Sequence, residues 1–213
     1  MPAVAVPSAL ENLQTRVQAC ICCPLHQGRR CAVPGVGPTP ARLMIVGEAP
    51  GENEDKLGLP FVGQAGELLD AMIDALNLTV PEIFITNAVK CRPPGNREPK
   101  AVEIQACRPF LLEEIRLANP TFILTVGAIG YQALTGRAFK ADAGHMQQID
   151  GRGILPTYHP AATFYTPALK IRIAKHLDTL KAWMGTLALG AHLALSAGPM
   201  NKVEQPEPGG RPR

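Results

Sequence analysis

Residues 42–76 read RLMIVGEAPGENEDKLGLPFVGQAGELLDAMIDAL and hold the clearest structural signals in the chain. The stretch opens with a short apolar run, residues 42–46, which ends at Gly47 as a buried strand would. It closes with residues 65–76, whose apolar side chains recur on one face at helical spacing. A buried strand followed by an amphipathic helix is the repeating unit of an α/β fold.

The same alternation of strands and helices continues along the chain. A capping box at Ser8 and Glu11 predicts the start of the first helix, and Pro99 is expected at the first position of a later one. The further predicted strands are residues 82–89, 121–126 and 154–158, and the further predicted helices are residues 8–20, 99–117, 128–134 and 166–187. Such an alternation predicts an α/β fold, a parallel sheet with helices on both faces.

The bulk composition indicates a single globular domain. The chain has 213 residues, of which 46% are hydrophobic and 18% charged, which excludes an intrinsically disordered protein. We assign residues 1–189 to the domain and residues 190–213, rich in proline, glycine and charge, to a disordered tail. No apolar run approaches the roughly 20 residues of a membrane helix, and residues 1–8 carry no basic secretory segment. We therefore expect a cytoplasmic protein with no membrane partner.

The net charge gives only a weak indication of a partner. The chain carries 21 basic and 18 acidic residues, a formal charge of +3. This charge favours a polyanionic partner slightly, but it is far below that of a protein that coats DNA.

Three of the predicted strands end in segments that suit a binding site. These segments are residues 47–51, Asn87 with the residues after it, and the pair His159 and Pro160. In open α/β sheets, ligands bind where the carboxyl ends of the strands meet, so the segments are expected to form one site. The alternative, about equally supported by these residues alone, is that Gly and Pro simply terminate the strands.

The segment after the first strand carries carboxylates and an aromatic residue. Glu48, Glu52, Glu54 and Asp55 follow the strand, and any of them has the chemistry of a general base for water. Phe61, on a constrained segment, has the shape to stack on a flat ligand. Taken singly, each is better explained as part of a solvated acidic loop or, for Phe61, of the core.

Asn87 and His159 are the polar residues at the other strand ends. A buried amide without a hydrogen bond costs about 1–3 kcal/mol. Asn87 must therefore bond a neighbouring loop or read the edge of a bound base. A lone histidine is more often structural, but the position of His159 directly after a buried strand makes it a candidate functional residue as well.

The cysteines suggest a metal site. Cys20 and Cys23 form a C-x-x-C pair, and Cys91 and Cys107 form a second, wider pair far along the chain. Zinc sites of four cysteines usually use two close C-x-x-C pairs, so the wider spacing suits an iron–sulfur cluster, although spacing alone leaves zinc open. Four buried free thiols are the less supported alternative, and disulfides are disfavoured in a reducing compartment.

Together these segments resemble the family 4 uracil-DNA glycosylases, the iron–sulfur branch of their superfamily. The resemblance runs in family order from about residue 12 to 185. The matching stretches are Cys20-x-x-Cys23-x-Leu25, GEAPGENEDKLGLPFVGQAG at 47–66, ITNAVKCRPPGNREP at 85–99, Cys107-Arg-Pro-Phe110 and His159-Pro160-Ala161. The family fold implied is a three-layer sandwich with a central four-stranded parallel sheet flanked by helices.

The resemblance also implies an activity and a cofactor. The activity is hydrolysis of the bond between uracil and deoxyribose in DNA, once the base has been flipped out of the duplex, which leaves an abasic site. The cofactor is a 4Fe-4S cluster on Cys20, Cys23, Cys91 and Cys107, with Cys22 and Cys31 as non-ligands.

For the base itself, the resemblance implies roles at three positions. Phe61 is expected to stack on uracil, Asn87 to pair with its Watson–Crick edge, and Ala49 to lie against the substrate. Some relatives outside this family have aspartate where this chain has Ala49, so water activation must lie with another residue.

For the chemistry, the resemblance implies two kinds of group. His159 is expected to stabilise the negative charge that develops on uracil. Glu48 or Glu54 is expected to position water and balance the positive charge of the sugar, and the sequence does not rank the two.

The segment after His159 departs from the family pattern. Leucines and an arginine commonly follow there, whereas this chain has Ala162-Thr163-Phe164-Tyr165. We expect Phe164 or Tyr165 to fill the gap left by the flipped base and Lys170 or Arg172 to hold a phosphate.

The expected partner is uracil-containing DNA, single- or double-stranded, bound by a monomer. Residues 92–99 contain no histidine, so covalent capture of the DNA, as in a related branch, is disfavoured. The alternative function is a catalytically weak iron–sulfur protein that binds DNA and senses uracil or damaged bases.

Overall fold

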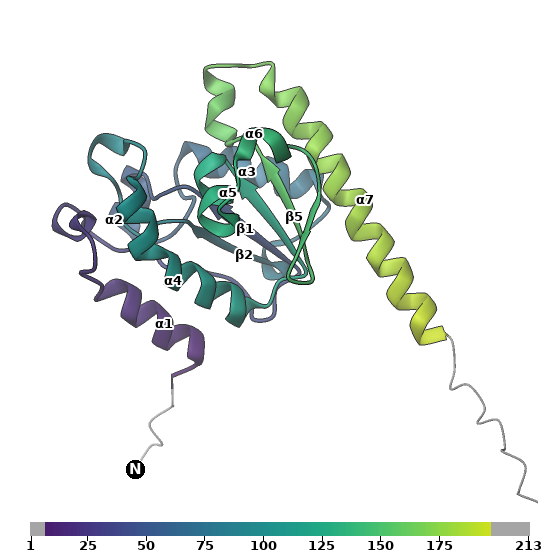
Figure 1. Cartoon of the computed structure of the whole chain (residues 1–213), viewed down its shortest axis with the longest axis horizontal. Coiled ribbons are helices and arrows are strands. Elements are labelled where there is room, and N and C mark those ends of the chain that lie inside the picture. Colours follow the sequence, from purple (N-terminus) through teal and green to yellow (C-terminus); the bar gives the residue numbers. More distant parts are fainter. Residues whose placement is uncertain (1–6, 197–213) are drawn as a thin grey trace, which may run out of the picture.

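A five-stranded sheet lies at the centre of the protein, in a computed structural model that describes residues 7–196 (Figure 1). The strands are β1 (Leu43–Gly47), β2 (Ile83–Asn87), β3 (Phe122–Val126), β4 (Gln147–Ile149) and β5 (Arg152–Thr157). Their order across the sheet is β2-β1-β3-β5-β4. The pairs β1–β2, β1–β3 and β3–β5 are parallel, and β4 pairs with β5 in the antiparallel sense.

Helices cover both faces of this sheet, as the sequence predicts. They are α1 (Ala9–Gln18), α2 (Glu52–Leu57), α3 (Gln64–Ala75), α4 (Ala101–Ala118), α5 (Ala128–Thr135), α6 (Phe139–Asp142) and α7 (Leu169–Ser196). In Figure 1, α4 and α5 lie in front of the sheet and α3 lies behind it. The α/β three-layer fold is thereby confirmed.

Alternation along β1 explains why both faces are apolar. Leu43 and Ile45 pack with α3 and α7, whereas Met44 and Val46 pack with α4 and α5. Every residue of β1 and β3 is buried, which accounts for the uninterrupted apolar runs in the sequence.

The start of α1 is also as predicted. The Ser8 hydroxyl accepts a hydrogen bond from the Glu11 N–H at 3.2 Å, and the Glu11 carboxylate accepts one from the Ser8 N–H at 2.6 Å. This is the capping box that the sequence indicates.

Three predictions need correction. The sheet has five strands rather than four, because Gln147–Ile149 forms a short edge strand without the apolar run of an interior one. The helix expected at Pro99 begins at Ala101, since the Glu103 carboxylate accepts the Lys100 N–H at 2.7 Å and fixes Lys100 as the cap. The last helix, predicted at residues 166–187, begins at Leu169 and continues to Ser196.

The rest of the predicted tail, residues 197–213, lies outside the described residues. Within residues 7–196, no helix combines the length and the apolar character needed to cross a bilayer.

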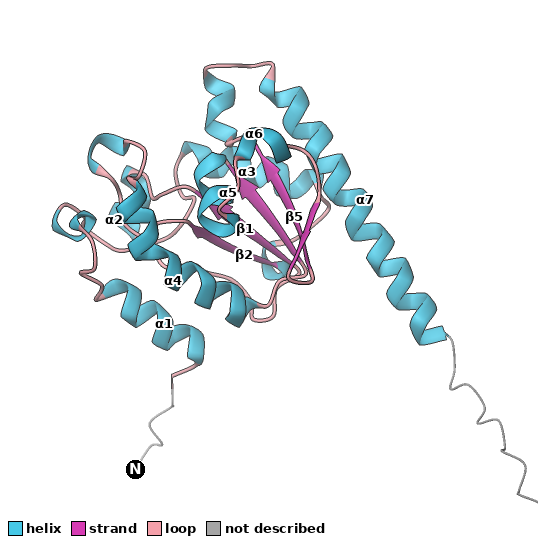
Figure 2. Ribbon diagram, in the orientation of Figure 1, coloured by secondary structure: helices cyan, strands magenta, loops and turns pink. Residues whose placement is uncertain are grey.

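The carboxyl ends of the parallel strands meet at one edge of the sheet. In Figure 2 the arrowheads of these strands point toward the same end, where loops gather. Gly47 pairs with Asn87 in the β1–β2 register, and the Ala88 N–H donates to the Gly47 carbonyl at 2.9 Å. The segments that follow Gly47 and Asn87 are therefore side by side, as the strand-end argument requires.

Candidate active site and cysteine cavity

A cleft of about 750 Å³ opens at the carboxyl end of the sheet. It is lined by segments that follow β1, β2 and β5. Among the lining residues are those expected to bind or act on the substrate, together with the two aromatic residues expected at the DNA: Glu48, Ala49, Glu54, Phe61, Asn87, His159, Phe164 and Tyr165. The structure thus brings together residues that lie more than a hundred positions apart in the sequence.

Gly47 makes room for two of these side chains. A Cβ at this position would clash with the Asn87 Oδ1 and lie 2.6 Å from the Phe61 Cζ. Asn87 is only 2% exposed, and its side chain borders the cleft. The absence of a side chain at Gly47 therefore lets an amide and an aromatic ring share one end of the cleft.

Glu54 holds the loop that carries Phe61. Its Oε1 accepts hydrogen bonds from the Val62 N–H at 2.9 Å and the Gly63 N–H at 2.8 Å, and its Oε2 accepts the Gly51 N–H at 3.0 Å. Phe61 adopts a φ of +54°, in the left-handed region that non-glycine residues seldom occupy. The buried Glu54 carboxylate is thus committed to three backbone donors and stabilises this unusual conformation.

Glu48 has different surroundings. It is half-buried at the cleft, and its main-chain carbonyl accepts the Val89 N–H at 3.1 Å, which fixes it beside the end of β2. Burial raises the pKa of Glu48, and the nearby charge of Glu98 raises it further. A carboxylate with a raised pKa is a stronger base once it has lost its proton.

His159 is held in one tautomer. Its Nδ1 accepts the Ala161 N–H at 3.2 Å, which caps the short helical turn Pro160–Phe164 and leaves the proton on Nε2. Burial lowers the pKa of His159, which favours the neutral ring. Its ring lies nearly parallel to that of Phe61, at 20° and with the centroids 6.4 Å apart. The site therefore contains a neutral N–H donor next to an aromatic face.

The residues expected to contact DNA divide into two groups. Phe164 and Tyr165 are 56% and 91% exposed at the cleft, at the end of the turn that His159 caps. Lys170 and Arg172 lie on α7, outside the cleft lining. Arg172 donates to the Tyr158 hydroxyl at 3.1 Å, and Lys170 lines a neighbouring groove.

Several cleft residues have no role predicted from the sequence. Arg97 lines the cleft, and its guanidinium forms two hydrogen bonds with the Glu103 carboxylate, at 2.9 and 2.7 Å. Asn53, Gln64, Pro93 and Asn96 also lie there. All of them fall inside the stretches at 47–66 and 85–99 that carry the family resemblance, which is the only signal that points to them.

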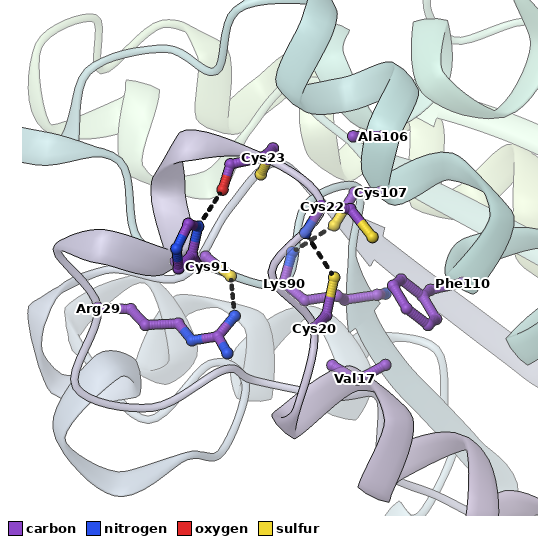
Figure 3. Close-up of a pocket in the computed structure, with 11 residues that line it drawn as sticks. Val17, Cys20, Cys22, Cys23, Arg29, Lys90, Cys91, Ala106, Cys107 and Phe110 are labelled. Atoms are coloured by element: carbon purple, nitrogen blue, oxygen red, sulfur yellow. Dashed lines mark hydrogen bonds between the residues drawn. The ribbon is translucent and has the colours of Figure 1, made fainter.

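The four predicted cysteine ligands line a second cavity (Figure 3). Cys20 and Cys23 come from the segment after α1, Cys91 from the segment after β2, and Cys107 from α4. Val17 and Phe110 contribute apolar walls, and Cys22 also lines the cavity, whereas Cys31 is not part of the lining. The cavity ties the N-terminal segment to the body of the protein.

The sulfur atoms accept N–H hydrogen bonds of the kind that stabilises metal-bound thiolates. The Lys90 N–H donates to Cys107 at 3.3 Å, the Arg29 guanidinium to Cys91 at 3.0 Å, and the Cys22 N–H to Cys20 at 3.5 Å. These bonds are drawn as dashed lines in Figure 3.

Burial opposes free thiolates in this cavity. It raises the pKa of Cys107 to about 12 and also raises that of Cys91, against the opposing effect of Arg29. A bound cationic metal centre would supply the compensating charge. Within the described residues, no three His, Cys, Asp or Glu side chains are placed to hold a single metal ion. The fit to the expected cluster rests on four cysteine donors that line one cavity, on the burial of Cys91 and Cys107, and on the N–H bonds to three of the sulfurs.

Comparisons with known proteins agree with this geometry. Residues 34–183 match the family model of the uracil DNA glycosylase superfamily. The chain is 42% identical to a type-4 uracil-DNA glycosylase of Pyrobaculum aerophilum, over 79% of this chain and 91% of that protein. The type-4 enzyme of Sulfurisphaera tokodaii is 42% identical over 76% of this chain and 79% of its own. That of Thermotoga maritima is 39% identical, over 71% of this chain and 81% of its own.

Proposed function

The chain belongs to the uracil-DNA glycosylase superfamily and acts in DNA repair as a hydrolase of N-glycosyl bonds, and we propose that the cleft is where it does so. The observation that carries this proposal is the meeting of Phe61, Asn87, His159 and Glu48 in one cleft. A base within a duplex cannot reach such a cleft, so the uracil must be flipped out of the stack to enter it.

Phe61 and Asn87 recognise the base. The Phe61 ring offers a stacking face, and the Asn87 amide offers one acceptor and two donors. The Asn87 Oδ1 accepts the N3–H of uracil while its Nδ2 donates to O4. Cytosine presents the opposite pattern at these two atoms, so with the amide in this orientation the Oδ1 would face an acceptor and the Nδ2 a donor.

His159 stabilises the leaving uracil. When the bond between C1′ of the sugar and N1 of the base breaks, its electron pair passes to the uracil ring and reaches O2. A neutral His159 donates its Nε2–H toward that oxygen, and because its Nδ1 is already bonded to the Ala161 N–H, the donor is oriented in advance.

Glu48 acts on the water. The carboxylate orients a water molecule toward C1′, balances the positive charge of the sugar in the transition state and takes the proton as the new C–O bond forms. The products are an abasic site and the uracil anion, which becomes free uracil by taking up a proton. Glu54 is instead a positioning residue, since its oxygens already accept three backbone N–H groups beneath Phe61.

The DNA lies across the exposed aromatic residues beside the cleft. Phe164 or Tyr165 fills the gap left by the flipped base, and Lys170 or Arg172 holds a phosphate on the α7 side. We expect the enzyme to act as a monomer in the cytoplasm on single- or double-stranded DNA.

Cys20, Cys23, Cys91 and Cys107 would hold a 4Fe-4S cluster. It would supply a structural tie between the N-terminal segment and the segment after Asn87, since hydrolysis itself needs no electron transfer. Purified protein is therefore expected to be brown, with visible iron–sulfur absorption. Cys107→Ser should lose this absorption, whereas Cys31→Ser should keep it, and a colourless protein that contains zinc would contradict the assignment.

The test of the activity is uracil release from oligonucleotides that contain a single uracil. Alkaline cleavage of the abasic product measures the reaction on single- and double-stranded substrates, and a thymine oligonucleotide is the control. Tight binding to uracil-DNA without release would favour the alternative, a protein that senses uracil, which is suggested by the altered segment from Thr163 to Tyr165.

A further inference from the structure

Lys90 is a buried lysine between the two sites. It stands three positions after Asn87 and directly before Cys91, and its side chain is 1% exposed. Its Nζ donates three hydrogen bonds: to the Glu114 Oε2 at 2.6 Å, to the Thr86 Oγ1 at 2.6 Å and to the main-chain carbonyl of Asn87 at 2.7 Å. An ammonium group has three N–H donors, so its capacity is fully used.

Glu114, on α4, completes a closed network. Its side chain is also 1% exposed, its Oε2 accepts the Thr86 hydroxyl at 2.7 Å, and its Oε1 accepts the Gly35 N–H at 2.8 Å. Every polar group of the pair has a protein partner. Such a network permits one arrangement of its members, because any shift would leave a buried charge unsatisfied.

The main chain of Lys90 reaches the cysteine cavity. Its N–H donates to the Cys107 sulfur at 3.3 Å, and its carbonyl accepts the Val33 N–H at 2.7 Å. Figure 3 draws the first of these bonds, with Lys90 among the cavity residues. One residue therefore fixes the carbonyl of Asn87 through its side chain and a cysteine sulfur through its backbone.

Stability alone does not explain the pair. The desolvation of two buried charges offsets much of their attraction, and well-packed neutral groups often serve as well or better. The network instead includes a hydrogen bond from Lys90 to the main-chain carbonyl of Asn87, whose side-chain amide faces the cleft.

We propose that the Lys90–Glu114 pair is a positioning device that sets the orientation of Asn87 toward uracil and joins it to the cysteine site. This inference rests on the proposed function. Lys90 does not touch the substrate, and it acts through Asn87. A misplacement of about 1 Å at a reacting or recognition group can lower a rate by about 10²-fold, and this sets the scale of the effect.

The first test is the double variant Lys90→Met with Glu114→Gln. It removes both charges, keeps an acceptor for the Gly35 N–H and leaves an amide to donate to Thr86. We expect the cluster absorption to stay, and kcat for uracil release to fall by about 10²-fold while KM changes by less than about threefold. The control removes a more exposed ion pair that joins α1 to α4, Arg16→Met with Glu113→Met, and should retain wild-type turnover.

The second test adds the double variant to Asn87→Ala. If the pair acts through Asn87, its loss should change kcat in that background by less than about threefold. A purely structural role would lower kcat equally in both backgrounds and reduce the cluster absorption. That result, or wild-type turnover in the double variant, would overturn the inference.

Thr86→Val gives a milder variant that removes only the hydroxyl between Lys90 and Glu114. It should fold and lower kcat by about 3- to 10-fold, a fraction of the effect expected for the pair. An unchanged kcat in a folded Thr86→Val protein would count against the device. If the wild-type protein releases no uracil in the same assay, the proposed function fails and the inference with it, a result distinct from wild-type turnover in the variants.

Discussion

The cleft and the cysteine cavity are built from neighbouring segments, but they differ in how many of their polar groups are already hydrogen-bonded within the protein. In the cleft, Glu48 and the Asn87 amide border open space, and His159 has only its Nδ1 engaged. In the cavity, the sulfurs of Cys20, Cys91 and Cys107 accept N–H hydrogen bonds within apolar walls. Open polar groups can bind a ligand, whereas enclosed and satisfied groups fix a structure. Under the proposed function, this difference separates the part that acts on uracil from the part that supports it.

The largest difference between the two regions should come from removing a side chain of the cleft that makes no contact with the cysteine cavity. His159→Ala should lower kcat for uracil release by about 10²–10³-fold, because it removes a donor aimed at the developing charge. The cluster absorption should stay at its wild-type value, and the melting temperature should fall only slightly, through loss of the cap on the turn Pro160–Phe164. The exposed His145 provides the control, since His145→Ala should leave all three measurements unchanged.

Filling the cleft should have the next largest effect. Gly47→Ala places a methyl group against the Asn87 Oδ1 and the Phe61 ring, so kcat/KM should fall by about 10²-fold. Gly28→Ala is the matched control, because a Cβ there meets nothing within 4 Å. Equal activity of the two variants in the release assay would show that the space beside Gly47 is not the base site.

The two carboxylates of the loop after β1 distinguish action from support within the cleft. Glu48→Gln should lower kcat by about 10²-fold, because an amide cannot take the proton of the attacking water. Glu54→Gln should lower it by only about 10-fold, since the amide nitrogen cannot accept an N–H, so at least one of the three backbone bonds is lost and Phe61 shifts. The melting temperature should fall in Glu54→Gln alone, and the reverse ranking of the two rates would exchange their roles.

The smallest expected effect is on pH dependence. Glu48 must be deprotonated to act, so activity is lost as the pH falls through its raised pKa. Burial is the main cause of that raised pKa and the charge of Glu98 is the second, so Glu98→Gln should move the acidic limb of kcat/KM to lower pH. A profile of kcat/KM against pH for both proteins measures this shift. An unchanged acidic limb would show that Glu98 does not raise the pKa of the group that limits activity.

Much of the fold is predictable because its strands are short apolar runs. β1 and β3 are buried along their whole length, and periodicity finds them directly. Periodicity does not predict β4, because this strand pairs with β5 at the edge of the sheet and contains two polar residues, Gln147 and Gln148. It does not predict the start of α4 either, because the first residue of this helix is fixed by the Glu103 carboxylate rather than by a proline.

The candidate site is predictable as a set of residues but not as a set of roles. Because each follows the end of a strand, we expect Glu48, Asn87 and His159 to lie together, and the structure places all three at one cleft. A position after a strand does not distinguish Glu48 from Glu54, because the two differ only in what their oxygens contact. Lys90 is missed for the same reason, since its buried partner Glu114 lies 24 positions further along the chain.

We propose that the cleft releases uracil while the cysteine site supports it. Uracil release by wild-type and Asn87→Ala proteins, with the cluster absorption recorded on the same samples, tests both halves of this proposal. We expect the wild-type protein to release uracil and Asn87→Ala to be slower by about 10²-fold or more, with the same absorption. Wild-type turnover by Asn87→Ala, or no release by the wild-type protein on either single- or double-stranded DNA, would contradict it.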